Sequence, residues 1–500
     1  MTQRTHLAET AVVIGAGPVG LAAAAHLVER GITPIVMEAG DGPGAAVREW
    51  GHVRLFSPWE FNVDAAARRL LESGGWAAPN PAHLPTGAEL VEDYLKPLAE
   101  SAELAPHIRY GVKVTAVARQ GVDKTRTVGR AGRPYLVRAR GESGGYIDVV
   151  ADAVIDASGT WGRPNPLGAH GLAAPGETEA ASHLAGPLPD VLGADRDRFT
   201  GKHTLVAGMG HSAANTLLAL AELAEQADGA RITWAIRGGS PNRLYGGGDA
   251  DALPARGKLG ARVKQLVADG KLTLLSDFAV DELQPVPGGP VTVIGRSGEE
   301  EVKLDVDVVA AATGFRPDLG ILREVRLDLD PAVEAPGKLA PLIDPNFHSC
   351  GTVPPHGEKD LAHPDEGFYI VGMKSYGRAP TFLMATGYEQ VRSIAAALAG
   401  DREAADSVQL ELPETGVCSS SPTVEDESGN VTFAAAATPA SRGLSTGAPH
   451  GYSGDAATLP VTLETQTAGG CCGATTSADS LAAPAPPGNR HGGSGATNPI

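Results

Sequence analysis

A glycine motif near the start of the chain constrains the fold more than any other feature. Gly15, Gly17 and Gly20 follow one another at GxGxxG spacing. The apolar run 11–14 before them predicts a buried strand, and the Ala-rich stretch 18–30 after them predicts a helix. In such a unit the first glycine makes a tight turn, the second admits a pyrophosphate, and the third lets helix and strand pack closely. The motif therefore predicts a dinucleotide-binding site, with phosphates at the helix N-terminus.

A second apolar run, residues 32–37, follows the predicted helix and ends in an acidic residue, Glu38. A carboxylate at this strand end is placed to accept hydrogen bonds from the hydroxyls of a ribose. The chain contains 64 glycines, so a chance glycine-rich turn is the alternative. The complete frame of strand, turn, helix, strand and terminal acid favours the nucleotide site.

The same pattern returns about 190 residues later. Residues 202–207 predict a strand, and Gly208 and Gly210 follow at the first two glycine positions. A helix is expected from Ser212, and Ala213 stands at the third glycine position, where the motif also permits alanine. The repeat therefore predicts a second dinucleotide site.

The two sites differ in the residue that ends the second strand. Residues 231–236 predict this strand in the repeat, and Arg237 follows them where the first site has an acid. An arginine suits the 2′-phosphate of NADPH, whereas a carboxylate suits a free ribose hydroxyl. We therefore expect the second site to prefer NADPH over NADH. The alternative is that Arg237 is a solvated strand end.

Three further apolar strands are expected to end in small residues. These strands lead into Gly159, Gly314 and Gly372. Because ligands bind outside the carboxyl ends of strands in open α/β sheets, we expect the three glycines to face bound nucleotides. Residues 381–399 predict an amphipathic helix whose N-terminus points back at the first site.

Composition excludes several classes of partner. The chain has 41 basic and 59 acidic residues, giving a net charge of −18, which argues against nucleic acid as the main partner. It has no uninterrupted run of 18 apolar residues, so we expect no membrane span. Four cysteines in 500 residues do not make a disulfide scaffold. We expect a cytoplasmic protein.

The composition changes near residue 405. Ser, Thr, Gly, Ala and Pro dominate from there on, and apolar periodicity is lost, so residues 405–500 are expected to form a disordered low-complexity tail. Cys418, Cys471 and Cys472 lie on this tail. Thiolates are soft ligands, so these three residues are a candidate site for trivalent arsenic or antimony. The alternative is that they are incidental exposed cysteines.

The two motifs, together with the sequences DASG (156–159) and ATGFRPD (312–318), resemble those of two-domain FAD/NAD(P)H flavoproteins. Disulfide reductases in that superfamily carry a redox pair of cysteines, but the part expected to fold here holds only Cys350. The stretches GMGHSA, GTWGRPNP and EGFYIVGMKSYG resemble the flavin-containing monooxygenase branch. A narrower resemblance, carried by KSYGRAPTFLMATGYEQVRSIAAAL and by the tail pieces ETGVCSS and GGCCG, is to flavin monooxygenase-like proteins of bacterial arsenic-resistance gene clusters.

The sequence also departs from the monooxygenase pattern. The fingerprint FxGxxxH lacks its Phe-x-Gly part, although His183 lies at about the right distance before the second glycine motif. Those families also place an asparagine beside the flavin, and neither Ser57 nor Asn62 is a secure match for it. No nucleophile–base constellation appears, so the catalytic residues stay unassigned.

The resemblance implies an α/β fold with two Rossmann-like domains, an NADPH domain (195–309) inserted into an FAD domain (8–165 and 310–400). It implies that NADPH reduces FAD, that molecular oxygen then reacts, and that a small molecule with a soft heteroatom, or a trivalent arsenic compound, is oxygenated. One alternative is a flavoprotein reductase that passes electrons to a partner. Another is a metalloid-binding protein acting through the tail cysteines. The expected cofactor-binding residues are Gly15, Gly17, Pro18, Gly20, Glu38, Gly159, Gly208, Gly210, Ser212, Arg237, Gly314 and Gly372.

Overall fold

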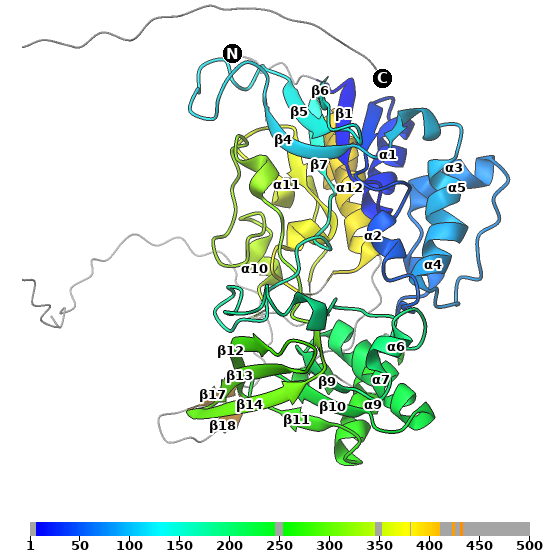
Figure 1. The fold of residues 1–500 in the computed structure, drawn as a ribbon. Helices are drawn as coiled ribbons and strands as arrows, with labels where there is room; N and C mark the ends of the chain where they lie inside the picture. Colours follow the sequence, from blue (N-terminus) through cyan, green and yellow to red (C-terminus); the bar gives the residue numbers. More distant parts are fainter. Residues whose placement is uncertain are drawn as a thin grey trace, which may run out of the picture. The chain divides into compact units, whose positions relative to one another are not determined.

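The computed structural model describes residues 7–245, 254–345, 353–380, 382–410, 423–425 and 431–433. Two parallel sheets form two Rossmann-like halves, and the chain leaves the first half, builds the second and then returns to the first (Figure 1). This confirms the expected fold class, with one nucleotide domain inserted into the other. The four cysteines and the greater part of the expected tail lie outside the described residues.

The first sheet joins segments from both ends of the described chain. Its strands are β1 (Thr10–Ile14), β2 (Thr33–Met37), β3 (Ile108–Arg109), β7 (Ala153–Asp156) and β16 (Phe368–Ile370). Their order is β16–β7–β1–β2–β3, and every neighbouring pair is parallel. The central strands β1 and β7 are buried on both faces because helices and an antiparallel sheet cover them.

Helix α1 (Pro18–Glu29) packs between this sheet and α12 (Met384–Leu398), and Figure 1 shows the two helices side by side. The small side chains at 22–25 are fully buried, which lets the helix approach its neighbours closely. An antiparallel sheet of β4 (Lys113–Arg119), β5 (Tyr135–Arg140) and β6 (Tyr146–Ala151) is inserted before β7. The remaining helical elements of this domain are α2 (Ala45–Arg48), η1 (Trp59–Phe61), α3 (Ala65–Ser73), α4 (Gly87–Leu90), the π-helix η2 (Val91–Leu95), α5 (Lys96–Ala99), η3 (Ala105–His107), η6 (Gly320–Leu322), α10 (Ala340–Ile343), α11 (Glu358–Leu361), η7 (Gly372–Tyr376) and α13 (Arg402–Asp406).

The second domain repeats the architecture around its own sheet. Its parallel strands are β8 (Leu184–Ala185), β9 (His203–Ala207), β10 (Arg231–Ala235), β11 (Thr273–Leu275) and β15 (Val308–Ala311), in the order β11–β10–β9–β15–β8. An antiparallel sheet of β12 (Phe278–Pro285), β13 (Val291–Ser297) and β14 (Glu300–Val306) packs beside it. The helical elements are η4 (Ala181–His183), α6 (Arg196–Phe199), α7 (His211–Gln226), α8 (Asn242–Tyr245) and α9 (Pro254–Ala268). Strands β17 (Thr423–Glu425) and β18 (Val431–Phe433) pair antiparallel with each other.

Helix α12 corrects one prediction. The sequence predicts an amphipathic helix over residues 381–399, but the helix spans residues 384–398 and residues 386–396 are buried on every side. The polar side chains are paired instead: Arg392 donates to both Glu389 carboxylate oxygens, at 2.7 and 2.9 Å, and to the carbonyl of Ala404 at 2.7 Å. The hydroxyl of Ser393 donates to the carbonyl of Ala405 at 2.7 Å.

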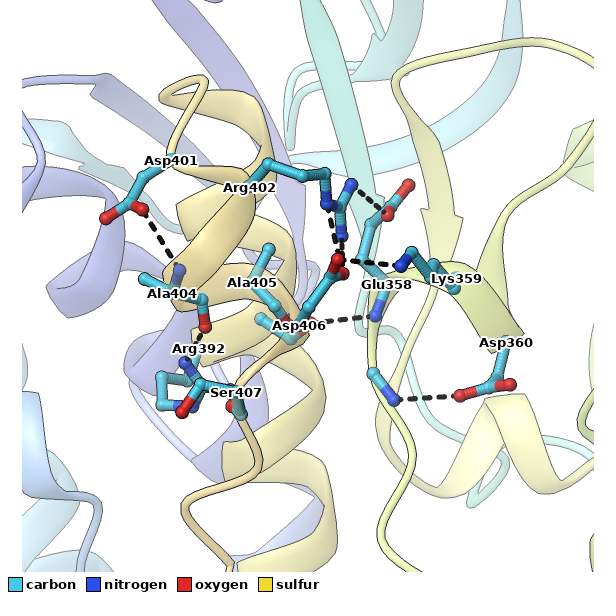
Figure 2. Close-up of polar contacts among 12 residues, drawn as sticks. Glu358, Lys359, Asp360, Arg392, Asp401, Arg402, Ala404, Ala405, Asp406 and Ser407 are labelled. Atoms are coloured by element: carbon cyan, nitrogen blue, oxygen red, sulfur yellow. Dashed lines mark hydrogen bonds and ion pairs between the residues drawn. The ribbon is translucent and has the colours of Figure 1, made fainter.

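The segment that covers this face is residues 401–410, which we call the C-terminal clasp. Ion pairs fix it to α11, because Arg402 contacts Glu358 and Lys359 contacts Asp406, each at 2.7 Å (Figure 2). Residues 405–410, which the sequence analysis assigns to the tail, therefore lie in the folded first domain. The amphipathic pattern did not reveal that the helix is buried on both faces, because the apolar face packs on the core and the polar face packs on the clasp.

Two truncations test the clasp. A chain ending at residue 410 should keep the melting temperature of the full-length protein. A chain ending at residue 400 removes the carbonyl of Ala404 that accepts from Arg392 and the carbonyl of Ala405 that accepts from Ser393, and we expect its melting temperature to fall by at least about 3 °C. Thermal unfolding followed by circular dichroism measures both. Equal melting temperatures for the two truncations would show that the clasp contributes nothing.

Candidate functional site: two dinucleotide turns and the carboxyl edge of the first sheet

The first glycine turn lies between β1 and α1, and the three glycines have different surroundings. Gly15 has φ +100°, and a Cβ there would lie 2.9 Å from the carbonyl oxygen of Ala157 on the neighbouring loop. A Cβ on Gly20 would lie 2.0 Å from the carbonyl oxygen of Gly15. A Cβ on Gly17 would meet no atom within 4 Å. The fold itself therefore requires Gly15 and Gly20, whereas only a bound group would require Gly17.

Glu38 lies beside this turn, half-buried after β2. Its two carboxylate oxygens accept hydrogen bonds from the backbone N–H groups of Ala16 and Gly40, both at 2.7 Å. Each oxygen keeps a further lone pair, so the carboxylate can still accept from ribose hydroxyls. Pro18 occupies the first helical position, where its fixed φ suits the helix and no N–H is lost.

The second glycine turn lies between β9 and α7, and its first two glycines have the same surroundings as those of the first turn. Gly208 has φ +133°, and a Cβ there would lie 2.0 Å from the carbonyl oxygen of Ala312. Gly210 faces open space, with no atom within 4 Å of an added Cβ. Ala213 is fully buried at the third position, and the indole N–H of Trp234 donates to the Gly208 carbonyl at 2.7 Å. Both turns therefore fit the phosphates of a dinucleotide.

Arg237 follows the end of β10 and is exposed, and Ser212 lies half-buried in the first turn of α7. Strand β10 pairs directly with β9, so its carboxyl end meets the same edge as the glycine turn. The ring of His211, the first residue of α7, packs 5.0 Å from the ring of Phe56 in the first domain. This contact brings a loop of the first domain to the second glycine turn.

Gly159 and Gly314 follow strands β7 and β15 with φ values of +67° and +84°. Gly159 opens onto free space at the carboxyl edge of the first sheet. The Gly314 carbonyl instead accepts from the N–H of Asn165 at 2.8 Å, and the Thr313 hydroxyl donates to the Asn165 carbonyl. Gly314 therefore lies where the two crossovers between the domains are paired.

Gly372 follows β16 with φ +66°, and its N–H donates to the Gln390 side chain at 2.8 Å. The fully buried Gln390 amide also contacts the Ser375 hydroxyl and the imidazole of His356, each at 2.9 Å. Burial lowers the pKa of His356, so its neutral form matches this network. Polar contacts that the sequence did not reveal thus fix the loop after β16.

The sequence analysis also did not predict a buried ion pair at the carboxyl edge of the first sheet. The ammonium of Lys374 lies 2.7 Å from Asp156 and 3.0 Å from the hydroxyl of Ser158, and both charged side chains are fully buried. The two charged residues are 218 positions apart. Only the pairing of β7 with β16 brings them together, so no sequence spacing could have indicated the contact.

Ser57 and Asn62, the candidates for a flavin-facing asparagine region, are buried and bonded to each other. The Asn62 amide donates to the Ser57 carbonyl at 2.7 Å and accepts from its hydroxyl at 2.8 Å. The amide of Asn62 therefore uses one N–H and one oxygen lone pair inside its own loop.

The proposed cysteine site, Cys418, Cys471 and Cys472, lies outside the described residues. Among residues with described positions, no three His, Cys, Asp or Glu side chains gather in a way that could hold a metal ion. Within the same ranges no helix combines the length and apolar character needed to cross a bilayer.

Comparison with known proteins agrees with this geometry. The model of the pyridine nucleotide-disulphide oxidoreductase family matches residues 12–337. The chain belongs to this family. It is a flavin-dependent oxidoreductase whose cofactors are FAD and NADPH.

Individual relatives are distant. A ferredoxin–NADP reductase of Salinispora tropica is 26% identical over 321 residues, which are 64% of this chain and 77% of that protein. The structure is similar to a bacillithiol disulfide reductase of Bacillus cereus, with a TM-score of 0.57, 20% identity, and coverage of 78% of this chain and 99% of that one. It is also similar to a cadaverine monooxygenase of Erwinia amylovora, with a TM-score of 0.56, 12% identity, and coverage of 82% and 98%. Both structures share the fold of this oxidoreductase.

The two open glycines give a matched pair of variants. Neither Gly17 nor Gly210 has positive φ, and neither would clash with the chain as alanine, so both variants should fold. We expect Gly17→Ala to weaken FAD binding by at least about tenfold, because the methyl group occupies the space of the pyrophosphate. Gly210→Ala should keep FAD and raise the KM for NADPH instead. Flavin content after gel filtration and initial rates measure the two effects, and an exchange of phenotypes would refute the assignment.

Proposed function

We propose that this oxidoreductase is an FAD monooxygenase that transfers one oxygen atom of O₂ to a soft heteroatom and releases the other as water, with NADPH supplying the two electrons. The observation that carries the proposal is the position of the first cysteine, Cys350. Residues 1–349 contain no thiol, so the disulfide chemistry in the family name has no residue pair there to accept electrons. We therefore propose that electrons delivered to FAD leave for another acceptor, molecular oxygen.

The residues of the two turns have distinct proposed roles. Gly17 and the N-terminus of α1 hold the diphosphate of FAD, with Glu38 on its ribose. Gly210 and the N-terminus of α7 hold the diphosphate of NADPH, and Arg237 holds its 2′-phosphate. When bound, the cofactors supply hydride transfer and oxygen chemistry, and the protein supplies orientation.

The proposed substrate is a small molecule with a soft heteroatom, such as a trivalent arsenic compound. Support comes from the resemblance to flavin monooxygenase-like proteins of arsenic-resistance clusters and from the three tail cysteines, whose thiolates select soft ions. If those cysteines only bind the metalloid, the protein is a metalloid-binding protein, and arsenite will bind without accelerating NADPH oxidation.

A second candidate is a reductase that passes electrons to a protein partner. Two observations favour it. The ferredoxin–NADP reductase of Salinispora tropica is similar over 64% of this chain. Asn62 is also buried and makes two hydrogen bonds with Ser57, so the structure does not expose this asparagine to a bound flavin.

Substitution of Arg237 tests the nucleotide preference. We expect Arg237→Ala to raise the KM for NADPH by about tenfold and to leave the KM for NADH unchanged, because only NADPH carries the 2′-phosphate. Arg231→Ala is the matched control, since Arg231 is an exposed arginine at the other end of the same strand. If both variants behave alike, Arg237 is a solvated strand end.

Product stoichiometry separates the two candidate functions. A monooxygenase supplied with arsenite or an organic sulfide should oxidise NADPH faster and form about one oxygenated product per NADPH, with little hydrogen peroxide. A reductase should form peroxide without product and should reduce an added electron carrier such as ferredoxin. Mass spectrometry of the product and a peroxide assay under one set of conditions distinguish these outcomes.

A further inference from the structure

Lys374, Asp156 and Ser158 form a closed ring of hydrogen bonds. One oxygen of Asp156 accepts from the Lys374 ammonium at 2.7 Å, and the other accepts from the hydroxyl and backbone N–H of Ser158, at 2.6 and 3.1 Å. The same hydroxyl accepts from Lys374 at 3.0 Å. Both charged side chains are fully buried, whereas Ser158 is exposed.

The ring lies at the edge where FAD is expected. Ile14 of β1, Asp156 of β7 and Ile370 of β16 are neighbours in register, so the loops that follow them lie side by side. The loop of β7, residues 157–159, packs against the first glycine turn, because a Cβ on Gly15 would lie only 3.3 Å from the Ser158 Cα. On its other side this loop opens to space at Gly159.

A contribution to folding stability alone does not explain why Lys374 and Asp156 are paired in the interior. Removing two charges from water costs as much as their attraction returns, so a buried ion pair is weak evidence of a stabilising role. The ring instead connects the buried carboxyl ends of β7 and β16 to the loop that contains the exposed Ser158. It therefore fixes the conformation of residues 157–159 at the surface that a nucleotide would cover.

We propose that Lys374 is a positioning residue for FAD, acting through Asp156 and Ser158 on the loop 157–159. The proposal rests on FAD being the nucleotide at the first glycine turn. The ammonium does not touch the reacting atoms in this account. It holds the loop so that its backbone groups meet the bound nucleotide without rearrangement.

The chain contains a matched control pair at the opposite edge of the same sheet. Arg130 and Asp365 are also buried and bonded, at 2.7 and 2.9 Å, and Asp365 precedes β16 instead of following it. Breaking either pair leaves a buried carboxylate without its cation. Only loss of the Lys374–Asp156 pair, at the carboxyl edge, should weaken the binding of the nucleotide.

The test compares three variants of the full-length protein after removal of FAD. We expect Lys374→Met to weaken FAD binding by at least about tenfold and Ser158→Ala by at least about threefold, with reduced quenching of flavin fluorescence. Arg130→Met should lower the melting temperature but change the FAD dissociation constant less than about twofold. Fluorescence titration with FAD gives the dissociation constants, and calorimetry gives the melting temperatures.

Two results would overturn the proposal. One is a folded Lys374→Met protein that binds FAD as the natural chain does. The other is an unchanged FAD affinity in Ser158→Ala, which decides the matter even where Lys374→Met does not fold, because Ser158 is exposed. Failure of the natural chain to bind FAD would instead refute the assignment of the first glycine turn.

Discussion

The parallel pairing of β7 with β1 on one side and β16 on the other determines the arrangement of the first site. It places Ile14, Asp156 and Ile370 in one row, so that three loops from distant parts of the chain emerge at the same edge. The close backbone contact between Gly15 and Ala157 is possible only without a side chain at Gly15. The glycine turn, the buried ion pair and the Gln390 network all depend on this row.

The nucleotide turns were predictable because their determinants are local. A tight turn, an open approach for phosphate and a helix N-terminus lie within a few residues, as at Gly15, Gly17 and Pro18, and the repeat at Gly208 is equally compact. The parallel sheets follow from the apolar runs that precede these turns. Arg237 could be identified on the same basis, because it directly follows the predicted second strand of the repeat, and the structure leaves its side chain exposed there.

The remaining features depend on contacts across the chain. Lys374 reaches Asp156 only after β16 joins the sheet, and His356 reaches Gln390 only after the segment that leads into α11 packs on α12. The polar face of α12 has the spacing of a solvated surface, yet the clasp covers it. The periodicity of a sequence shows that one face of a helix is polar. It does not show whether that face is covered by water or by another polar segment of the protein.

The fold does not by itself select the final electron acceptor, since disulfide reductases and monooxygenases share it. The central claim is that NADPH reduces FAD and that no cysteine pair beside the flavin takes up the electrons. Anaerobic titration with NADPH, followed by flavin absorbance, tests it most directly. The account predicts complete reduction by about one equivalent of NADPH per FAD, because residues 1–349, which carry both glycine turns, contain no cysteine that could form a redox disulfide beside the flavin. A requirement for about two equivalents would contradict it.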